Sequence, residues 1–147
     1  MTIKHLTQQF VERFPETLVT GELYLAMEFA TAAHLCACGC GNKVITPFSP
    51  TDWQMSFDGE TVSLKPSIGN WTFRCRSHYW IRSGRIEWAG DMSQEAINAG
   101  RKHDAQSKVQ QQSGRSISGG IRQQAPSAHE HIQIPSLLGK LKKWLGL

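Results

Sequence analysis

The sequence predicts a mainly β fold, a small antiparallel domain of short hairpins followed by a C-terminal helix and an appended tail. Three observations lead to this prediction: alternating apolar residues around tight-turn dipeptides, a helical pattern after Trp88, and a polar stretch rich in Gln, Ser and Gly beyond it. The chain has 147 residues, 39% of them hydrophobic and 19% charged, as expected of one soluble domain. This length excludes a large multidomain machine.

Two turn dipeptides define the clearest strands. Asp58-Gly59 and Ser83-Gly84 each separate two alternating runs, and residues of these types tolerate the positive φ of a two-residue hairpin turn. The predicted hairpin strands are residues 53–57, 60–64, 78–82 and 85–89, and further strands are predicted at residues 23–29, 43–46 and 71–74.

The apolar pattern becomes helical after Trp88. Asp91 or Ser93 is a suitable N-cap for a helix that runs through Ile97 to about Gln112, and Gly100 weakens this helix. We therefore expect a β domain over residues 1–105, a mobile polar linker over 106–131 and a short amphipathic docking segment over 132–147. The docking segment either folds back onto the body or contacts a partner or a membrane surface.

The formal net charge of +4 is unevenly distributed. Residues 1–100 carry 8 basic and 10 acidic side chains, whereas residues 101–147 carry 8 basic and 2 acidic ones. The body therefore offers no phosphate-binding stripe, and nucleic-acid binding would be a property of the tail alone. No apolar run approaches the roughly 18 residues of a membrane span, and the first residues lack the order of a secretory signal. A cytoplasmic location is expected.

Four cysteines, Cys36, Cys38, Cys40 and Cys75, predict a metal site, because a reducing cytosol favours metal binding over disulfides. A tetrahedral zinc ion would place its thiolates about 3.8 Å from one another. Residues i and i+2 of a straight strand are roughly 6.6 Å apart, so the chain must bend sharply within residues 36–41. Glycines alternate with cysteines there and permit that bend.

The ligand set has two further candidates. His34 lies two residues before Cys36, and His78 has a Cys-x-x-His spacing with Cys75. Four cysteine ligands would make a closed, structural zinc site, which we favour, whereas three protein ligands plus water would make a hydrolytic one.

Five segments resemble a known family: residues 34–41, 46–53, 57–64, 66–71 and 75–81. The family is catalogued as domain of unknown function sixty-five twenty-seven, and the resemblance covers roughly residues 15 to 105. It implies a zinc-binding, peptidase-like protein of bacterial operons that also encode a ubiquitin-like protein with E1-like and E2-like enzymes. The implied activity is processing or removal of the ubiquitin-like protein, in a pathway of antiviral defence.

A peptidase needs a nucleophile, a base and an orienting group. His78 is the best base if cysteines satisfy the metal, and Ser67 is the best nucleophile, on a predicted loop where Gly69 and neighbouring amides could supply oxyanion donors. Glu28 is the third candidate, since a carboxylate in an apolar strand is costly unless it is paired or functional, and it could orient His34 or His78.

Each of these residues also has a plain structural interpretation. His78 could be buried or metal-bound, Ser67 could form a turn, and Glu28 could be an edge-strand charge. We therefore keep two functions open: a serine peptidase with a structural zinc that acts on a ubiquitin-like protein, and a non-catalytic zinc-stabilised adaptor in the same kind of pathway.

Overall fold

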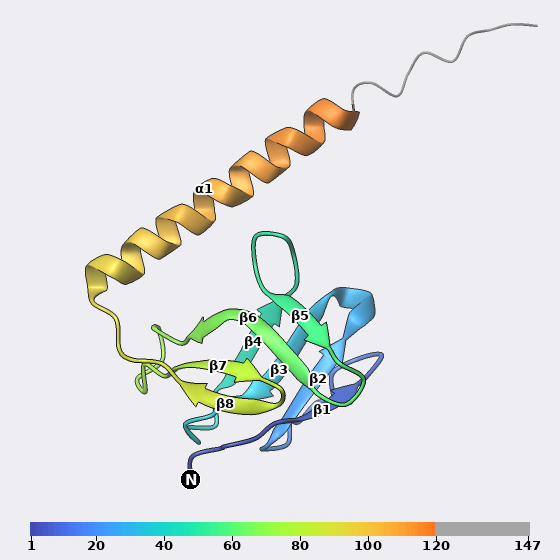
Figure 1. Cartoon of the computed structure of the whole chain (residues 1–147), viewed down its shortest axis with the longest axis vertical. Coiled ribbons are helices and arrows are strands. Elements are labelled where there is room, and N and C mark those ends of the chain that lie inside the picture. Colours follow the sequence, from blue (N-terminus) through green and yellow to red (C-terminus); the bar gives the residue numbers. More distant parts are fainter. Residues whose placement is uncertain (120–147) are drawn as a thin grey trace, which may run out of the picture. The chain divides into compact units, whose positions relative to one another are not determined.

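A computed structural model of the chain describes residues 1–119, with side chains as far as Arg115. Within these residues, eight strands form two four-stranded sheets and a long helix follows them (Figure 1). This arrangement confirms the predicted mainly β fold class with its helix. The predicted docking segment, residues 132–147, lies outside the described residues, as does the linker beyond residue 119.

The first sheet has the strand order β1-β2-β3-β4. The strands are β1 (Thr7–Phe10), β2 (Glu22–Ala26), β3 (Thr31–Leu35) and β4 (Lys43–Pro47), and a short 3-10 helix, η1 (Met27–Phe29), follows β2. β1 pairs in parallel with β2, and the other neighbours are antiparallel. β3 leads directly into the cysteine segment, so this sheet positions three of the four thiols.

The second sheet is an antiparallel meander of β5 (Gln54–Phe57), β6 (Val62–Gly69), β7 (His78–Arg82) and β8 (Arg85–Trp88). Both predicted hairpins are present, and the turn at Ser83-Gly84 has two residues with positive φ, as predicted. The loop at Asp58-Gly59 has four residues, 58–61, because Phe57 pairs with Val62, so the predicted two-residue turn is wrong there. The Asp58 carboxylate accepts hydrogen bonds from the backbone N–H groups of Thr61 and Glu60 and from the Thr61 hydroxyl. These bonds lower the pKa of Asp58 to about 2 and account for this residue structurally.

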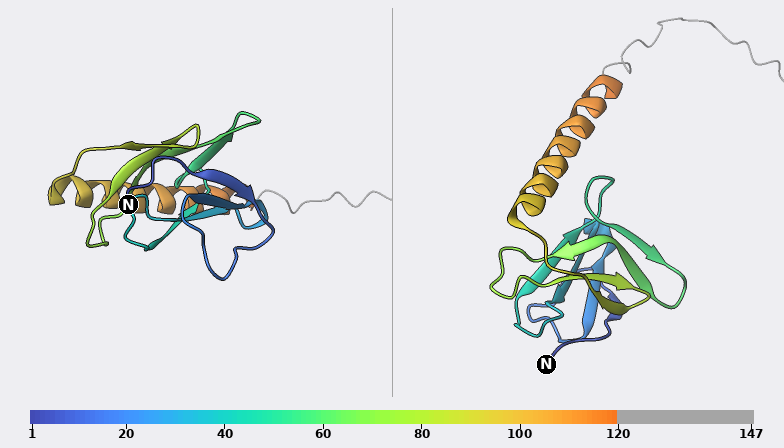
Figure 2. Two further views of the ribbon diagram at one scale, coloured as in Figure 1. Left: turned by 90° about the horizontal axis from the view of Figure 1, so that it is seen from below. Right: turned by 60° about the vertical axis from the view of Figure 1, so that its left-hand side comes forward.

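The hydrophobic core lies between the two sheets, which Figure 2 shows from two further directions. Leu23 and Leu25 of β2 belong to the same buried cluster as Leu64 of β6 and Ile81 of β7, and each is at most 1% exposed. The segment before β1 joins the sheets, because Leu6 N–H donates to the carbonyl of Gly84 at 2.7 Å. The sheets are thus held by packing between their faces and by hydrogen bonds at one edge.

Helix α1 (Gln94–Gly119) begins at the predicted N-cap, where the Ser93 hydroxyl accepts a hydrogen bond from Ala96 N–H at 3.2 Å. Ile97 is buried, and most of the other described side chains of α1 are exposed. The compact unit Met1–Gly114 includes both sheets and most of this helix. Among the described residues, no helix is long and apolar enough to cross a membrane.

Three local predictions are wrong. Residues 71–74 form a turn and no strand, because the chain bends there, with Phe73 N–H donating to the carbonyl of Asn70. The strand predicted over residues 23–29 ends at Ala26, and η1 follows it. α1 continues to Gly119, past its predicted end at about Gln112 and through the first part of the predicted linker. The Gln and Lys residues within 106–112 have high helix propensity even without apolar partners.

Replacement of the core residue Leu64 tests the packing of the two sheets. Leu64→Ala should lower the free energy of unfolding by about 2–5 kcal/mol, because it removes fully buried methyl groups and leaves a cavity. Chemical denaturation monitored by tryptophan fluorescence measures this loss. Val109→Ala, at a helix position that is 62% exposed, is the control and should stay within about 0.5 kcal/mol of the wild type. Equal effects of the two substitutions would contradict this core.

Candidate active site and metal centre

The four cysteine thiols converge at the end of β3. The Sγ atom of Cys36 lies 3.4 Å from that of Cys38 and 3.9 Å from that of Cys75, and Cys40 lies 3.8 Å from Cys75. All four sulfurs lie within 4.8 Å of one another. Thiolates on a tetrahedral ion are about 3.8 Å apart, so these residues fit a metal ion with four sulfur ligands.

The bend that joins the first three cysteines depends on glycine. Gly39 and Gly41 have φ values of 86° and 78°, as predicted for a sharply bent segment. A Cβ atom on Gly39 would also come within 2.5 Å of the Met1 carbonyl oxygen, so the space is closed to any larger residue. Cys75 is supplied by the turn between β6 and β7, and the cluster therefore links the two sheets.

Two buried polar residues attach the cluster to the second sheet. The Ser77 hydroxyl lies 3.0 Å from the Cys36 sulfur and accepts a hydrogen bond from the side-chain amide of Asn70 at 2.9 Å. Asn70 follows β6 and Ser77 precedes β7. A small buried polar network of Asn70 and Ser77 therefore connects the ends of β6 and β7 to the thiol cluster.

The structure places His34 away from the thiol cluster. Its side chain is fully buried in β3, and its Nε2 atom lies 2.9 Å from the hydroxyl oxygen of Tyr79. Burial lowers the pKa of His34 to about 4, because the charged imidazolium would lose its hydration. Burial also raises the pKa of Tyr79, and the neighbouring Cys36 raises it further. Both groups are neutral core residues at neutral pH.

Ser67 and His78 form the second functional group of the site. Ser67 lies on β6 and His78 begins β7, and the Ser67 Oγ atom is 2.9 Å from the His78 Nε2 atom. The prediction that Ser67 lies on a loop is wrong, because β6 extends through Gly69. The pairing of β6 with β7 is irregular between Leu64 and Ile68, and Ser67 lies within this irregular part of the strand. A hydroxyl and an imidazole are thus within hydrogen-bond distance, as a nucleophile and its base would need to be.

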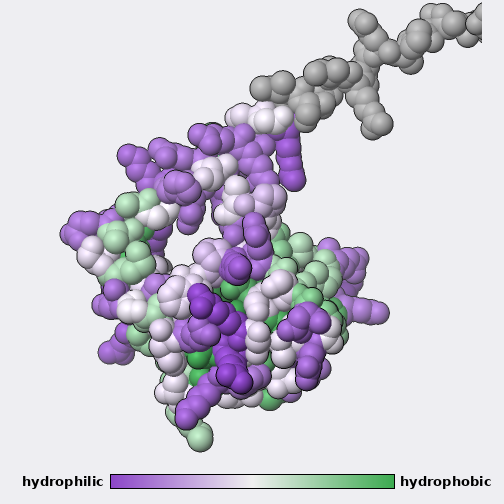
Figure 3. All heavy atoms as spheres, viewed as in Figure 1, coloured by the Kyte–Doolittle hydropathy of each residue, from purple (hydrophilic) through white to green (hydrophobic). Residues whose placement is uncertain are grey.

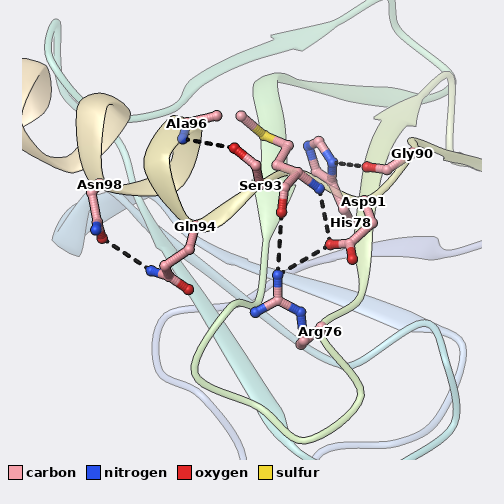
Figure 4. A network of polar contacts seen from close by, with 9 residues as sticks. Arg76, His78, Gly90, Asp91, Ser93, Gln94, Ala96 and Asn98 are labelled. Carbon is pink, nitrogen blue, oxygen red and sulfur yellow. Dashed lines mark hydrogen bonds and ion pairs between the residues drawn. The ribbon is translucent and has the colours of Figure 1, made fainter.

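The other ring nitrogen of His78 fixes its tautomer. The Nδ1 atom lies 2.8 Å from the carbonyl oxygen of Gly90 (Figure 4). A carbonyl can only accept, so the Nδ1 atom of a neutral imidazole must carry the proton. The Nε2 atom then has a free lone pair, which accepts the hydrogen bond from the Ser67 hydroxyl. This is the arrangement a general base requires.

Two aromatic rings lie close to His78. The ring centroids of Trp71 and Trp80 lie 4.9 Å and 5.9 Å from that of His78. The guanidinium of Arg76 stacks on Trp71 and also bonds to the Asp91 carboxylate at 3.2 Å (Figure 4). The backbone N–H of Met92 and then Arg76 lower the pKa of Asp91. These contacts fix the segment that carries the Gly90 carbonyl, so the imidazole has a defined orientation.

Glu28 is not joined to this pair. It lies on η1 and is exposed, and among the described residues no hydrogen bond or ion pair connects it to His34 or His78. The argument for Glu28 assumed a carboxylate in an apolar strand, but β2 ends before it. The orienting partner of His78 is instead the backbone carbonyl of Gly90, which side-chain patterns in a sequence do not reveal.

The Ser67–His78 pair opens into a cavity of about 440 Å³. Its body side includes Asp52, Pro66 and Trp71, and its other side is formed by α1. A second cavity of about 390 Å³ shares Asp52 and Pro66 with the first and is also lined by Gln54, Lys65, Trp80 and Arg82. Because they share Asp52 and Pro66, these two neighbouring cavities are together called the groove.

Asp52 lies in the turn between β4 and β5 and is held there by two side-chain contacts. Its carboxylate lies 2.6 Å from the Lys108 ammonium and accepts a hydrogen bond from the Ser49 hydroxyl. The bond with Lys108 lowers the pKa of Asp52. The two residues of this ion pair are 56 positions apart in the sequence, and no local pattern signals the contact.

Replacement of one cysteine tests the metal centre. Cys75→Ser should lose most of the bound metal and lower the melting temperature, because the cluster joins the two sheets. Metal content by plasma mass spectrometry and thermal unfolding measure both effects. His78→Gln is the comparison and should keep the metal, since His78 is no member of the thiol cluster. Metal loss in His78→Gln with retention in Cys75→Ser would contradict the four-thiol site.

Comparison with known proteins adds the family. No curated protein and no solved structure matches this chain. A family model described as the bacterial ubiquitination-like system serine protease, BubE, matches residues 10–89, a segment that contains all four cysteines together with Ser67 and His78. This match confirms the expected link to a bacterial ubiquitin-like system but not the numbered family named from the sequence. Since the matched segment is more than half of the chain, the protein belongs to the BubE family of serine proteases.

Proposed function

We propose that this protein is a serine peptidase that processes a ubiquitin-like protein or removes it from its conjugates, with Ser67 as nucleophile and His78 as general base. The single observation that supports these roles best is the pair of contacts made by the His78 ring, with Ser67 at Nε2 and the Gly90 carbonyl at Nδ1. A non-catalytic adaptor would need neither contact. The family name supports the reaction class.

The reaction follows from these two contacts. As the Ser67 oxygen attacks the carbonyl carbon of the scissile bond, its proton passes to His78 Nε2, and the bond to the leaving group breaks as the imidazolium returns that proton to it. An acyl ester on Ser67 remains. A water molecule then attacks the ester carbonyl while it loses a proton to His78 Nε2. The ester bond to Ser67 breaks, and the imidazolium returns that proton to the Ser67 oxygen as the acid is released.

The backbone of β6 can supply an oxyanion donor. Asn70 N–H donates to the carbonyl of Ser77 at 2.8 Å, and Gly69 is the register partner of His78. In an antiparallel pair, hydrogen-bonded and non-hydrogen-bonded residue pairs alternate, so the N–H of Gly69 points away from β7. This donor lies two residues from Ser67 on the same strand and is suited to the negative oxygen of the tetrahedral intermediate.

A neutral carbonyl takes the place of a carboxylate beside His78. The Gly90 oxygen stabilises the imidazolium less than an ionised carboxylate would, but it fixes the same tautomer. The nearby carboxylate of Asp91 is bonded to Arg76 and to the backbone N–H of Met92. Asp91 therefore holds the Gly90 segment in place and adds a negative charge to the surroundings of the imidazole.

The metal centre is assigned a structural role. Cys36, Cys38, Cys40 and Cys75 would hold a zinc ion, whose four thiolate bonds would leave no open position. The ion would cross-link the end of β3 to the turn between β6 and β7. Because Ser67 lies on β6 and His78 on β7, this cross-link would keep the nucleophile and the base in register.

The substrate is assigned from the family and from the groove. An extended C-terminal tail of a ubiquitin-like protein fits a groove that runs past Ser67 over the face of the sheet. E1-like and E2-like enzymes would be further partners in such a system, acting in the cytoplasm in antiviral defence.

Removal of the nucleophile tests this function. Ser67→Ala should reduce cleavage of the ubiquitin-like protein of the same system, extended at its C-terminus by a reporter peptide, by at least about 10³-fold. Intact-mass spectrometry of the products measures cleavage and locates the cut. Ser56→Ala, at an exposed position on β5, should keep wild-type activity. Full cleavage by Ser67→Ala would exclude the serine mechanism, and unchanged metal content would show that the loss is chemical.

Addition of one methyl group at Gly69, beside Ser67 and His78, should lower the activity. A Cβ atom on Gly69 would lie 2.3 Å from the Trp71 indole nitrogen, so Gly69→Ala must displace the ring that packs on His78. We expect kcat/KM to fall by between roughly 10- and 100-fold, with the melting temperature little changed. Gly114→Ala, where a Cβ meets nothing within 4 Å, is the matched control. Wild-type kcat/KM in Gly69→Ala would show that Trp71 does not position His78.

A further inference from the structure

The segment that matches the family model ends at residue 89, but the catalytic cavity does not. Its second side is made by residues of α1: Ala96, Ile97, Gly100, Arg101, Asp104 and Lys108. Ala96, Gly100, Asp104 and Lys108 are four residues apart, and Ile97 and Arg101 lie next to two of them, so the six positions share one face of the helix. Figure 3 shows an opening between part of α1 and the β body.

α1 is attached to the body on both sides of this cavity. At its start, Ile97 is buried, and the Arg76 guanidinium bonds to the Asp91 carboxylate and the Met92 carbonyl just before the helix. Farther along, Lys108 pairs with Asp52, and the Thr51 hydroxyl donates to the side-chain oxygen of Gln111 at 3.3 Å. The distance between α1 and Ser67 is thus set by contacts on either side of the cavity, so the helix can act as a wall.

Gly100 lies between these two attachments. It lines the cavity, and a Cβ built on it meets nothing within 4 Å, so the space in front of it is open. Glycine in a helix interior costs up to about 1 kcal/mol relative to alanine. No backbone requirement explains the glycine, since its φ is not positive, and the open space beside the catalytic pair is the feature it provides.

The opposite wall offers backbone groups. The pairing of β5 with β6 ends at Gln54 and Lys65, and pairing with β7 leaves the C=O group of Gly69 pointing away from β7, besides the N–H proposed as oxyanion donor. Such groups can hydrogen-bond to an extended peptide lying alongside. The cavity thus has the unpaired backbone groups of β6 on one wall and the open space at Gly100 of α1 on the other. An extended peptide could lie in the slot between these two walls.

We propose that α1 is the second wall of the substrate cleft and that Gly100 sets the width of the slot in which the extended tail of the substrate lies between α1 and β6. This inference rests on the proposed function for the identity of the substrate. Gly100 would then help to determine which peptides bind. Peptide specificity would depend partly on α1, which lies beyond the segment that matches the family model.

The test enlarges residue 100 in steps. Gly100→Ala and Gly100→Leu are compared with Gly114→Leu, which makes the same change in the same helix at a position that does not line the cavity. Binding of a fluorescein-labelled peptide covering the C-terminal tail of the ubiquitin-like protein is measured by fluorescence anisotropy in a Ser67→Ala background. Hydrolysis of the full ubiquitin-like fusion and of p-nitrophenyl acetate is measured with Ser67 present.

Gly100→Leu should weaken peptide binding by about tenfold or more and lower the ratio of kcat/KM for the fusion to kcat/KM for the acetate by a similar factor. Gly100→Ala should have a smaller effect, and Gly114→Leu should keep the wild-type Kd and ratio. Equal values for Gly100→Leu and Gly114→Leu, or equal losses in both, would overturn the proposal. Failure of the proposed function would look different, because the wild type would not cleave the fusion whatever residue 100 is.

Discussion

The pairing of β6 with β7 is the constraint on which the rest of the structure depends. Side chains of neighbouring residues in a strand point to opposite faces, so Ser77 faces the Cys36 sulfur while His78 faces Ser67 on the outer side. A shift of one residue in this register would exchange the two faces and destroy both groups at once. The thiol cluster and the Ser67–His78 pair are therefore two consequences of one alignment.

The parts of the fold that the sequence predicts are those encoded by short-range patterns. The hairpins at Asp58-Gly59 and Ser83-Gly84 and the bent cysteine segment depend on residues within a few positions of one another, and all three are present. The N-cap at Ser93 is a similarly local signal. The local pattern fails where a turn is required by a contact that is distant in the sequence. Residues 71–74 have the pattern of a strand, but the chain turns there and places Cys75 beside the other thiols.

The site is predictable only as far as side chains determine it. Ser67 and His78 were selected for the chemistry of their side chains and lie together. Glu28 was selected because a carboxylate in an apolar strand is costly unless it is paired or functional, but Glu28 lies on η1. The group at Nδ1 is a backbone carbonyl, which every residue possesses and no composition can signal. The ion pair of Asp52 with Lys108 was missed for a different reason, since it depends on where α1 lies.

The separation of the two groups on opposite faces also bears on the choice between a metal-assisted and a serine mechanism. A metal ion that activates water must face the substrate cavity with an open coordination position. Cys36 is fully buried, and none of the four cysteines lines the cavity that contains Ser67 or its neighbour. Four sulfurs at tetrahedral spacing would also saturate the ion. This geometry supports the proposed structural role of the thiols and the proposed catalytic role of Ser67 and His78 on the other face.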